Sequence, residues 1–237
     1  MPTIRLDKYI SDLGLGSRKE IRDWIRSGRV SVDGRVIRQS DEKLDPASAA
    51  VCLDGEALRY RKAVYLMMNK PEGVITATED ENQKTVLDLL PKTLRSRGLF
   101  PVGRLDKDTS GLLILTDDGD YAHRVSAPKS GVVKRYLAEV DGEPDEEDAA
   151  AFQSGLVLAD GTRCLPAELE ILGDRRCIVS VSEGKYHQVK RMLASRGKPV
   201  KALKRLSIGA LDLDESLAPG EFRELSEQEL CTVFMVR

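Results

Sequence analysis

The chain has 237 residues, of which 41% are hydrophobic and 32% are charged, and its formal net charge is −2. This composition is typical of a folded globular protein and excludes collagen-like, low-complexity and disordered classes. The longest apolar run, residues 63–68, is far below the ~20 residues that span a bilayer, and the N-terminus lacks the apolar core of a signal peptide, so we expect a cytoplasmic protein.

The charged residues are segregated along the chain. Residues 1–40 carry nine basic and five acidic side chains, and residues 183–206 carry eight basic and one acidic. Residues 139–176 and 207–237 are instead strongly acidic. Because local patches set the potential that a polyanion meets, the two basic segments predict contacts with nucleic acid.

The first 40 residues predict a small unit of two helices and a hairpin. Apolar residues recur at helical spacing over 6–13. Ser17 and Glu20 form a capping box, with Ser17 as the N-cap of a second helix. A short strand at 30–32 then meets Asp33-Gly34, a strong signal for a hairpin turn.

Residues 41–61 are polar, turn-rich and mixed in charge, so we expect a linker from about residue 41 and a domain boundary near Tyr60. The domains would then be residues 1–60 and 61–237. In the second domain, strand patterns outnumber helices and lack a regular β-α-β order, which predicts an α+β fold with a mixed or antiparallel sheet and flanking helices. The expected strands are at 63–68, 99–102, 112–116, 134–140 and 178–181, and the expected helices at 85–90 (one turn), 121–125, 146–153 and 186–196.

The densest polar cluster is the segment 103–111, which lies between two apolar strand patterns. Loops of this kind often carry function. Taken alone it allows three interpretations: a calcium loop starting at Asp106 and Asp108, a phosphate-transfer aspartate of the haloacid-dehalogenase kind, or a simple turn capped by its own side chains. The flanking strand patterns disfavour a calcium loop, which needs helices, and a phosphatase would need a parallel sheet.

Cysteine and histidine give no sign of a metal site. The four cysteines form no C-x-x-C pair, so we interpret them as reduced thiols. The two histidines, His123 and His187, are far apart in the sequence, so no zinc constellation is visible.

Several motifs agree in kind and order with one family. Arg104-Leu-Asp106 with Thr109-Ser-Gly111 resembles the catalytic motif of pseudouridine synthases, in the branch that modifies ribosomal RNA. Residues 68–73 look like the strand-end motif before that loop, and Lys134-Arg-Tyr136 matches the family's Lys-x-Tyr strand. Residues 183–192, Glu-Gly-Lys-Tyr-His-Gln-Val-Lys-Arg-Met, resemble the third motif in the form typical of RsuA-type small-subunit enzymes. The N-terminal unit is similar to the S4 RNA-binding domain that precedes the catalytic domain in that branch.

The resemblance implies isomerisation of a uridine in ribosomal RNA to pseudouridine, with no cofactor or metal. It implies that Asp106 is the nucleophile and that Tyr136 stacks on the uracil and accepts the C5 proton, directly or through water. Lys190 is expected to pair with Asp106 and keep it ionised, with Arg191 as the alternative if the register differs by one residue.

The resemblance also implies RNA contacts around the site and on the S4-like unit. Arg104 is expected to fill the space left by a flipped base, and His187 and Gln188 to shape the pocket or contact the RNA backbone. Phosphate contacts are expected from basic residues on the S4-like unit: Arg5, Lys8, Arg18, Lys19, Arg22, Arg26 and Arg29.

The expected partner is ribosomal RNA, free or in a partly assembled subunit. The third motif favours 16S rRNA, with 23S rRNA as the alternative. We expect a monomer without an obligate protein partner. A non-catalytic S4-type RNA-binding protein is the main alternative from another class.

Overall fold

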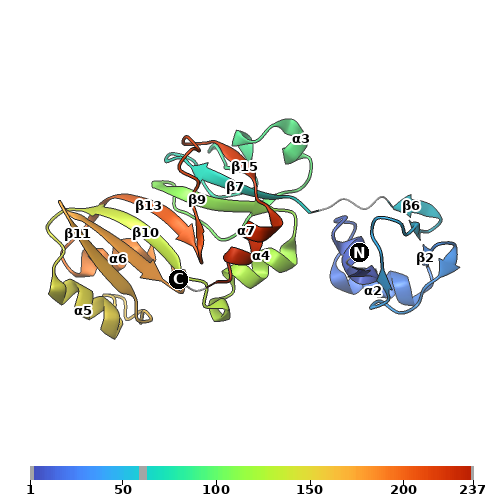
Figure 1. The fold of residues 1–237 in the computed structure, drawn as a ribbon, viewed down its shortest axis with the longest axis horizontal. Helices are drawn as coiled ribbons and strands as arrows, with labels where there is room; N and C mark the ends of the chain where they lie inside the picture. The colour runs from blue at the N-terminus through green and yellow to red at the C-terminus, as the bar shows by residue number, and fades with distance from the viewer. Residues whose placement is uncertain (1–2, 59–62, 236–237) are drawn as a thin grey trace. The chain divides into compact units, whose positions relative to one another are not determined.

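The computed structural model describes residues 3–58 and 63–235, and it divides the chain into two compact units, Met1–Ala63 and Val64–Arg237 (Figure 1). The expected domain boundary near Tyr60 lies outside the described residues. Among the helices of the described residues, none has the length and hydropathy needed to cross a bilayer.

The first unit packs two helices on small antiparallel sheets. Its core is formed by apolar residues of both helices together with Val30 and Val51. The capping box of Ser17 and Glu20 is confirmed. The hairpin turn is confirmed too, with Asp33 and Gly34 both at positive φ. The elements are β1 (Ile4–Arg5), α1 (Leu6–Ser11), α2 (Arg18–Arg26), β2 (Val30–Val32), β3 (Arg35–Val36), β4 (Lys43–Leu44), β5 (Val51–Leu53) and β6 (Glu56–Leu58).

The prediction of a linker from about residue 41 is wrong. β4 pairs with β1, while β5 and β6 complete a sheet of order β3-β2-β5-β6. Leu44 and Val51 are buried in the core of the first unit. Strands of two or three residues leave no measurable alternation in the sequence, so this segment looked like an irregular connection although it closes the core.

The second unit is built on one nine-stranded sheet whose main order is β11-β12-β10-β13-β9-β7-β15. Of its paired strands, β13 and β9 are parallel and the other pairs are antiparallel. This confirms the α+β class with a mixed sheet. The strands are β7 (Tyr65–Lys70), β8 (Phe100–Pro101), β9 (Thr109–Thr116), β10 (Lys134–Val140), β11 (Glu168–Gly173), β12 (Arg176–Val181), β13 (Val200–Ile208), β14 (Leu211–Asp212) and β15 (Phe222–Glu224).

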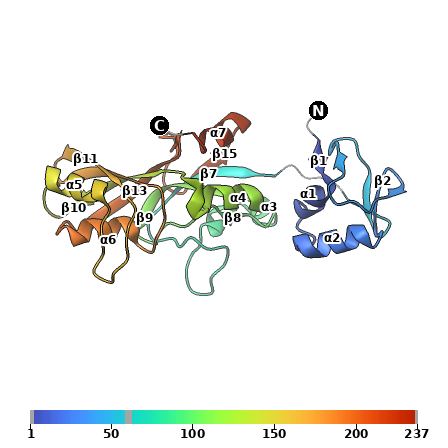
Figure 2. The same cartoon turned by 90° about the horizontal axis from the view of Figure 1, so that it is seen from below.

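Helices cover both faces of this sheet. α6 and α5 pack on the half formed by β10 to β13, while α4 packs on the half that contains β7 and β9. Figure 2 shows α6 and the segment between β7 and β8 on one side of the sheet and α7 on the other. The helices are η1 (Leu87–Leu89), α3 (Lys92–Arg95), α4 (Gly119–Ser126), η2 (Pro128–Ser130), α5 (Glu146–Ser154), α6 (Gln188–Ser195) and α7 (Glu227–Thr232).

The two halves of the sheet meet at a short junction. β9 and β13 pair only over residues 109–111 and 203–205. Gly111 has a φ of +102°, and a Cβ there would lie 2.3 Å from the carbonyl oxygen of Arg205, so the close approach requires glycine. The buried Arg205 donates from Nε to the carbonyl of Leu112 at 2.7 Å. The loop that carries Asp106 enters β9 directly before this junction.

Candidate active site

The loop before β9 is held from beneath by Lys70, the last residue of β7. The Lys70 side chain is fully buried. Its Nζ donates to the carbonyl oxygens of Pro71 at 3.0 Å, Asp106 at 3.0 Å and Thr109 at 2.8 Å. Because one ammonium binds carbonyls on both sides of the loop, it fixes the backbone that presents the Asp106 side chain. Lys70 lies in the motif of residues 68–73, but no role was predicted for it.

Burial lowers the pKa of Lys70 from 10.5 to about 8. The folded chain therefore releases this proton near pH 8 and the unfolded chain near 10.5. Between these values the unfolded state binds more protons, so Lys70 makes the free energy of unfolding rise with pH. At pH 7 the group is charged in both states.

Urea unfolding of wild type and Lys70→Met from pH 7 to 10 would test this linkage. The wild type should gain stability relative to the variant above pH 8, by an amount on the order of 3 kcal/mol at full deprotonation. Parallel pH dependences in the two proteins would contradict the buried, easily deprotonated ammonium.

The structure brings Asp106 and Lys190 together across the sheet junction. Lys190, on α6, places Nζ 3.1 Å from Oδ2 of Asp106 and 2.5 Å from Oδ1 of Asp108. The hydrogen bond from Lys190 holds the pKa of Asp108 below its ordinary value. Burial opposes the charge of Lys190, but its bonds to the two carboxylates raise its pKa overall. Asp108 was not predicted as a site residue.

His187 approaches the other oxygen of Asp106. Its Nε2 lies 3.4 Å from Oδ1 of Asp106. His187 is the N-cap of α6 and adopts the left-handed conformation with φ +47° and ψ +36°, which is uncommon for a residue other than glycine. The ring of Tyr186 stacks on it, with centroids 3.9 Å apart and 16° between the planes. Tyr186 was also missed by the sequence, although it lies inside the third motif.

A small pocket of about 80 Å³ joins these groups. Its walls include Arg104, Asp106, Tyr136, His187, Gln188 and Lys190, so six of the predicted site residues line one cavity. Tyr136 lies on β10, opposite Arg205 of β13, and is half-buried. Arg104 is exposed at the rim. The pocket can therefore present a carboxylate, an ammonium and a phenol to one small planar group.

The side chains of Gln188 and Arg191 form contacts with other residues of the protein. The buried Gln188 donates to Oε1 of Glu183 at 2.7 Å and accepts from the backbone N–H of Lys185 at 2.9 Å, so it shapes the pocket wall. Arg191 forms an ion pair with Asp160 at 2.5 Å. Lys190, and not the alternative Arg191, is therefore the cation beside Asp106.

The basic residues predicted for RNA binding on the first unit lie on or directly after its first strand and two helices. Several form ion pairs on the surface: Arg5 with Asp7 at 2.8 Å and Arg29 with Asp54 at 2.5 Å. Exposed pairs of this kind contribute little stability, so phosphates can replace the carboxylates at small cost. The full set is Arg5, Lys8, Arg18, Lys19, Arg22, Arg26 and Arg29.

The other two chemical interpretations of the loop do not fit its surroundings. A calcium loop of the helix–loop–helix kind needs flanking helices, whereas β8 precedes this loop and β9 begins at Thr109. A haloacid-dehalogenase-like site would need a parallel sheet, and this sheet is mostly antiparallel. The described residues contain no cluster of three or more His, Cys, Asp or Glu side chains arranged to hold a metal ion.

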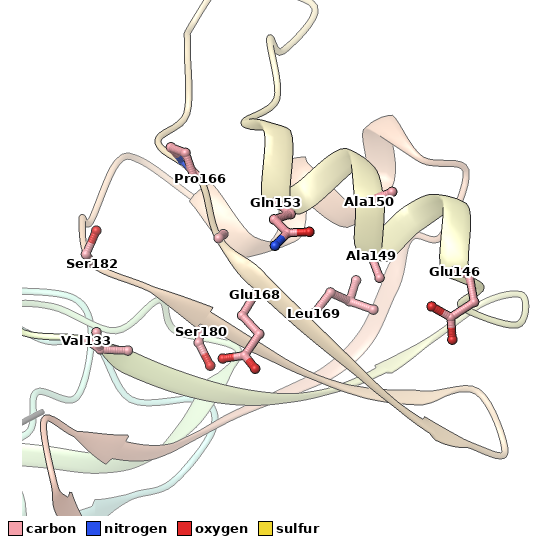
Figure 3. Close-up of a pocket in the computed structure, with 11 residues that line it drawn as sticks. Val133, Glu146, Ala149, Ala150, Gln153, Pro166, Glu168, Leu169, Ser180 and Ser182 are labelled. Atoms are coloured by element: carbon pink, nitrogen blue, oxygen red, sulfur yellow. The ribbon is translucent and has the colours of Figure 1, made fainter. Parts of the chain in front are cut away.

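A larger hollow of about 660 Å³ lies beside α5 and β11 (Figure 3), and Asp106 is not among the described residues that line it. Glu146 and Gln153 of α5 and Glu168 of β11 border it. Among the described residues that line it there are two carboxylates and no basic group. The hollow is therefore unsuited to a polyanion and carries none of the groups gathered around Asp106.

Comparison with known proteins agrees with this arrangement over both units. The profile of RNA pseudouridylate synthases matches residues 64–195, and that of the S4 domain matches residues 4–48.

Among curated relatives, the ribosomal small subunit pseudouridine synthase A of Salmonella typhimurium is 42% identical over 235 residues, covering 97% of this chain and 100% of that protein. The protein of Bacillus subtilis named uncharacterized RNA pseudouridine synthase YtzG is 45% identical over 232 residues, covering 96% and 97%. A crystal structure of a pseudouridylate synthase matches with a TM-score of 0.70 at 35% identity, covering 97% of this chain and 99% of that one.

Proposed function

Because the chain belongs to the RNA pseudouridylate synthase family, of the RsuA type with an S4 domain, we propose that it isomerises one uridine of 16S ribosomal RNA to pseudouridine with Asp106 as the nucleophile. The observation that carries the proposal is the contact between Asp106 and Lys190 in a pocket shared with Tyr136. RNA binding alone requires no such set, which disfavours a non-catalytic binding protein.

The reaction needs only what this pocket holds. The N1–C1′ bond breaks, the uracil turns in place, and a C5–C1′ bond forms. C5 loses a proton and N1 gains one, so atoms and electrons balance without an oxidant, a reductant or a metal. Asp106 acts as a covalent catalyst whose carboxylate must be ionised and able to leave again, by attack on C1′, by addition to the ring, or by assisting a glycal route.

Each neighbouring group has a proposed part in the same sequence. Lys190 stabilises the negative charge of Asp106 through the 3.1 Å contact between its ammonium and Oδ2. Tyr136 stacks on the uracil and accepts the C5 proton, directly or through water. The target base has to leave its stack in the RNA, at a cost of a few kcal/mol. The exposed Arg104 at the rim occupies or supports the space that the base leaves behind.

The choice of the small subunit follows from relatives that are named ribosomal small subunit pseudouridine synthase A. On this basis 16S rRNA is the first substrate to test, and 23S rRNA is the second. The protein would act as a monomer on either free rRNA or a partly assembled subunit.

Mapping of pseudouridine at single-nucleotide resolution tests the proposal. Both rRNAs from a strain lacking this gene would be incubated with the purified protein, labelled with carbodiimide and read by primer extension. One new stop in 16S rRNA supports the proposal, and a stop in 23S rRNA corrects the substrate. If free rRNA gives no stop, partly assembled subunits are the next substrate. Intact RNA binding without a stop on either would favour the binding-protein alternative.

The S4 unit is expected to supply the electrostatic part of RNA affinity. Reversing the charge of Arg18 and Arg22 to Glu should weaken binding strongly and reduce the slope of log K against log salt by about 2, since each phosphate contact contributes close to one. Binding titrations from 50 to 300 mM salt would measure the slope.

The matched control for this prediction is the reversal of Arg175 and Arg176. Both are exposed in the second unit, Arg175 in the turn between β11 and β12 and Arg176 as the first residue of β12, and their replacement by Glu changes the net charge by the same amount. An equal loss of slope in both variants would show that net charge, and not the predicted face, governs binding.

A further inference from the structure

Tyr186 is a large aromatic side chain left open at the edge of the active-site pocket. It remains 76% exposed, which is unusual for a tyrosine. It stands between Lys185 and His187, both of which line the pocket. The proposed reaction assigns no role to this ring.

The ring is held in a fixed orientation despite its exposure. It lies nearly parallel to the imidazole of His187, with 3.9 Å between the centroids. The backbone carbonyl of Tyr186 accepts a hydrogen bond from Arg191 at 3.3 Å, and His187 Nε2 lies 3.4 Å from Asp106 Oδ1. One face of the phenol is therefore covered by the imidazole, and this stacked pair is in contact with Asp106.

The backbone that produces this stack is strained. His187 is in the left-handed region, where a residue with a Cβ is disfavoured. Strain of this kind persists where the surroundings impose it and is frequent at functional sites. The conformation at His187 accompanies the turn that leads into α6 and leaves the phenol of Tyr186 open to solvent.

The charges around Tyr186 favour RNA over protein as the group that covers the open face. Residues 183–206 carry eight basic side chains against one acidic. Lys185, Lys190 and Arg104 line the pocket. Exposed aromatic rings beside basic side chains are the usual platform for unpaired bases, because every base has a π-face that can stack.

We propose that Tyr186 is a stacking platform for an unpaired nucleobase that flanks the target uridine, an inference that rests on the proposed function. The base, Tyr186 and His187 would form a three-layer stack that ends beside Asp106. The flanking nucleotide is thereby docked at a fixed distance from the nucleophile, and this contributes to the choice of target site.

The experiment is a double-mutant cycle that combines protein variants with RNA variants. The protein would be wild type, Tyr186→Ala, Tyr186→Leu or Tyr186→Phe. The RNA would be the fragment of rRNA that wild type modifies, either intact or made abasic at one nucleotide within two positions of the modified uridine. KM and kcat for tritium release from 5-tritiated uridine would be measured for each combination.

We expect Tyr186→Ala and Tyr186→Leu to raise KM about 10- to 100-fold, the range found when stacking on one base is lost, with a smaller change in kcat. Tyr186→Phe should stay within about threefold of wild type, because it keeps the ring. At one flanking position, removal of the base should cost wild type as much as the alanine substitution does, and should cost the alanine variant nothing more.

Equal losses for Tyr186→Ala on every abasic RNA, or a fall in kcat with KM unchanged, would overturn the platform and leave Tyr186 as a support for His187. Leu172→Ala, which truncates another exposed apolar side chain, controls for nonspecific loss of surface. Wild-type activity on the intact RNA tests the proposed function itself, so its failure is distinguishable from a failure of this inference.

Discussion

Replacing Asp106 with asparagine is expected to lower pseudouridine formation by about 10⁴-fold or more, the scale seen when a covalent nucleophile is removed. The amide keeps the shape of the side chain but lacks the charge and the nucleophilic oxygen. The fold should be retained, because Lys70 binds the backbone carbonyl of Asp106 and not its side chain. Thermal unfolding within a few degrees of wild type would confirm this.

The measurement is single-turnover release of tritium from RNA labelled at C5 of uridine. Asp108→Asn is the matched control, since Asp108 binds the same ammonium but its side chain is 75% exposed. We expect this control to lose no more than about tenfold, because the ion pair of an exposed carboxylate contributes about 1 kcal/mol or less. If Asp106→Asn retained about a tenth of wild-type activity, Asp106 could not be the nucleophile.

Replacing Lys190 with methionine is expected to have the second largest effect. Asp106 would lose the ammonium that lies 3.1 Å from its Oδ2. Loss of one such charged contact typically lowers a rate by about 10²- to 10³-fold.

Single-turnover release of tritium from RNA labelled at C5 of uridine would measure the loss. Lys190→Arg should recover much of the rate, since it restores a positive charge. Lys198→Met is the control: Lys198 is equally covered, with a side chain 16% exposed against 19% for Lys190, but it binds Asp148 at 3.1 Å. A rate within about threefold of wild type in Lys190→Met would contradict the proposed role.

Much of the fold could be predicted because local signals were strong. The capping box at Ser17 and the strand at 134–140 were both correct. β11, β13 and β15 were missed. β13 carries three basic side chains among nine residues, so its charge obscured the strand pattern, and β15 has only three residues. Such strands are defined by their partners in the sheet and not by their own composition.

The only site residues that could be predicted are those that lie in the family's sequence motifs. Asp106, Tyr136 and Lys190 could be named from the resemblance, and the structure places them in one pocket. The support by Lys70 could not be predicted, because a buried ammonium beneath a loop depends on contacts with residues 36 to 39 positions away. The contact of Lys190 with a second carboxylate, that of Asp108, could not be predicted either, since the spacing in the loop does not show which oxygens face α6.

The pairing of β15 with β7 has a consequence for biosynthesis. Phe222–Glu224 lies along Leu66–Met68, so a strand that is synthesised after the other strands of this sheet covers the edge of the first strand of the second unit. The edge of β7 in an emerging chain stays uncovered until residues 222–224 have left the ribosome, and open edges invite pairing with other chains. The parallel contact of β13 with β9 also waits for a long connection to close, which slows folding. The nascent enzyme therefore depends on the synthesis of residues 222–224, and termination before them would yield aggregating fragments and not a weaker catalyst.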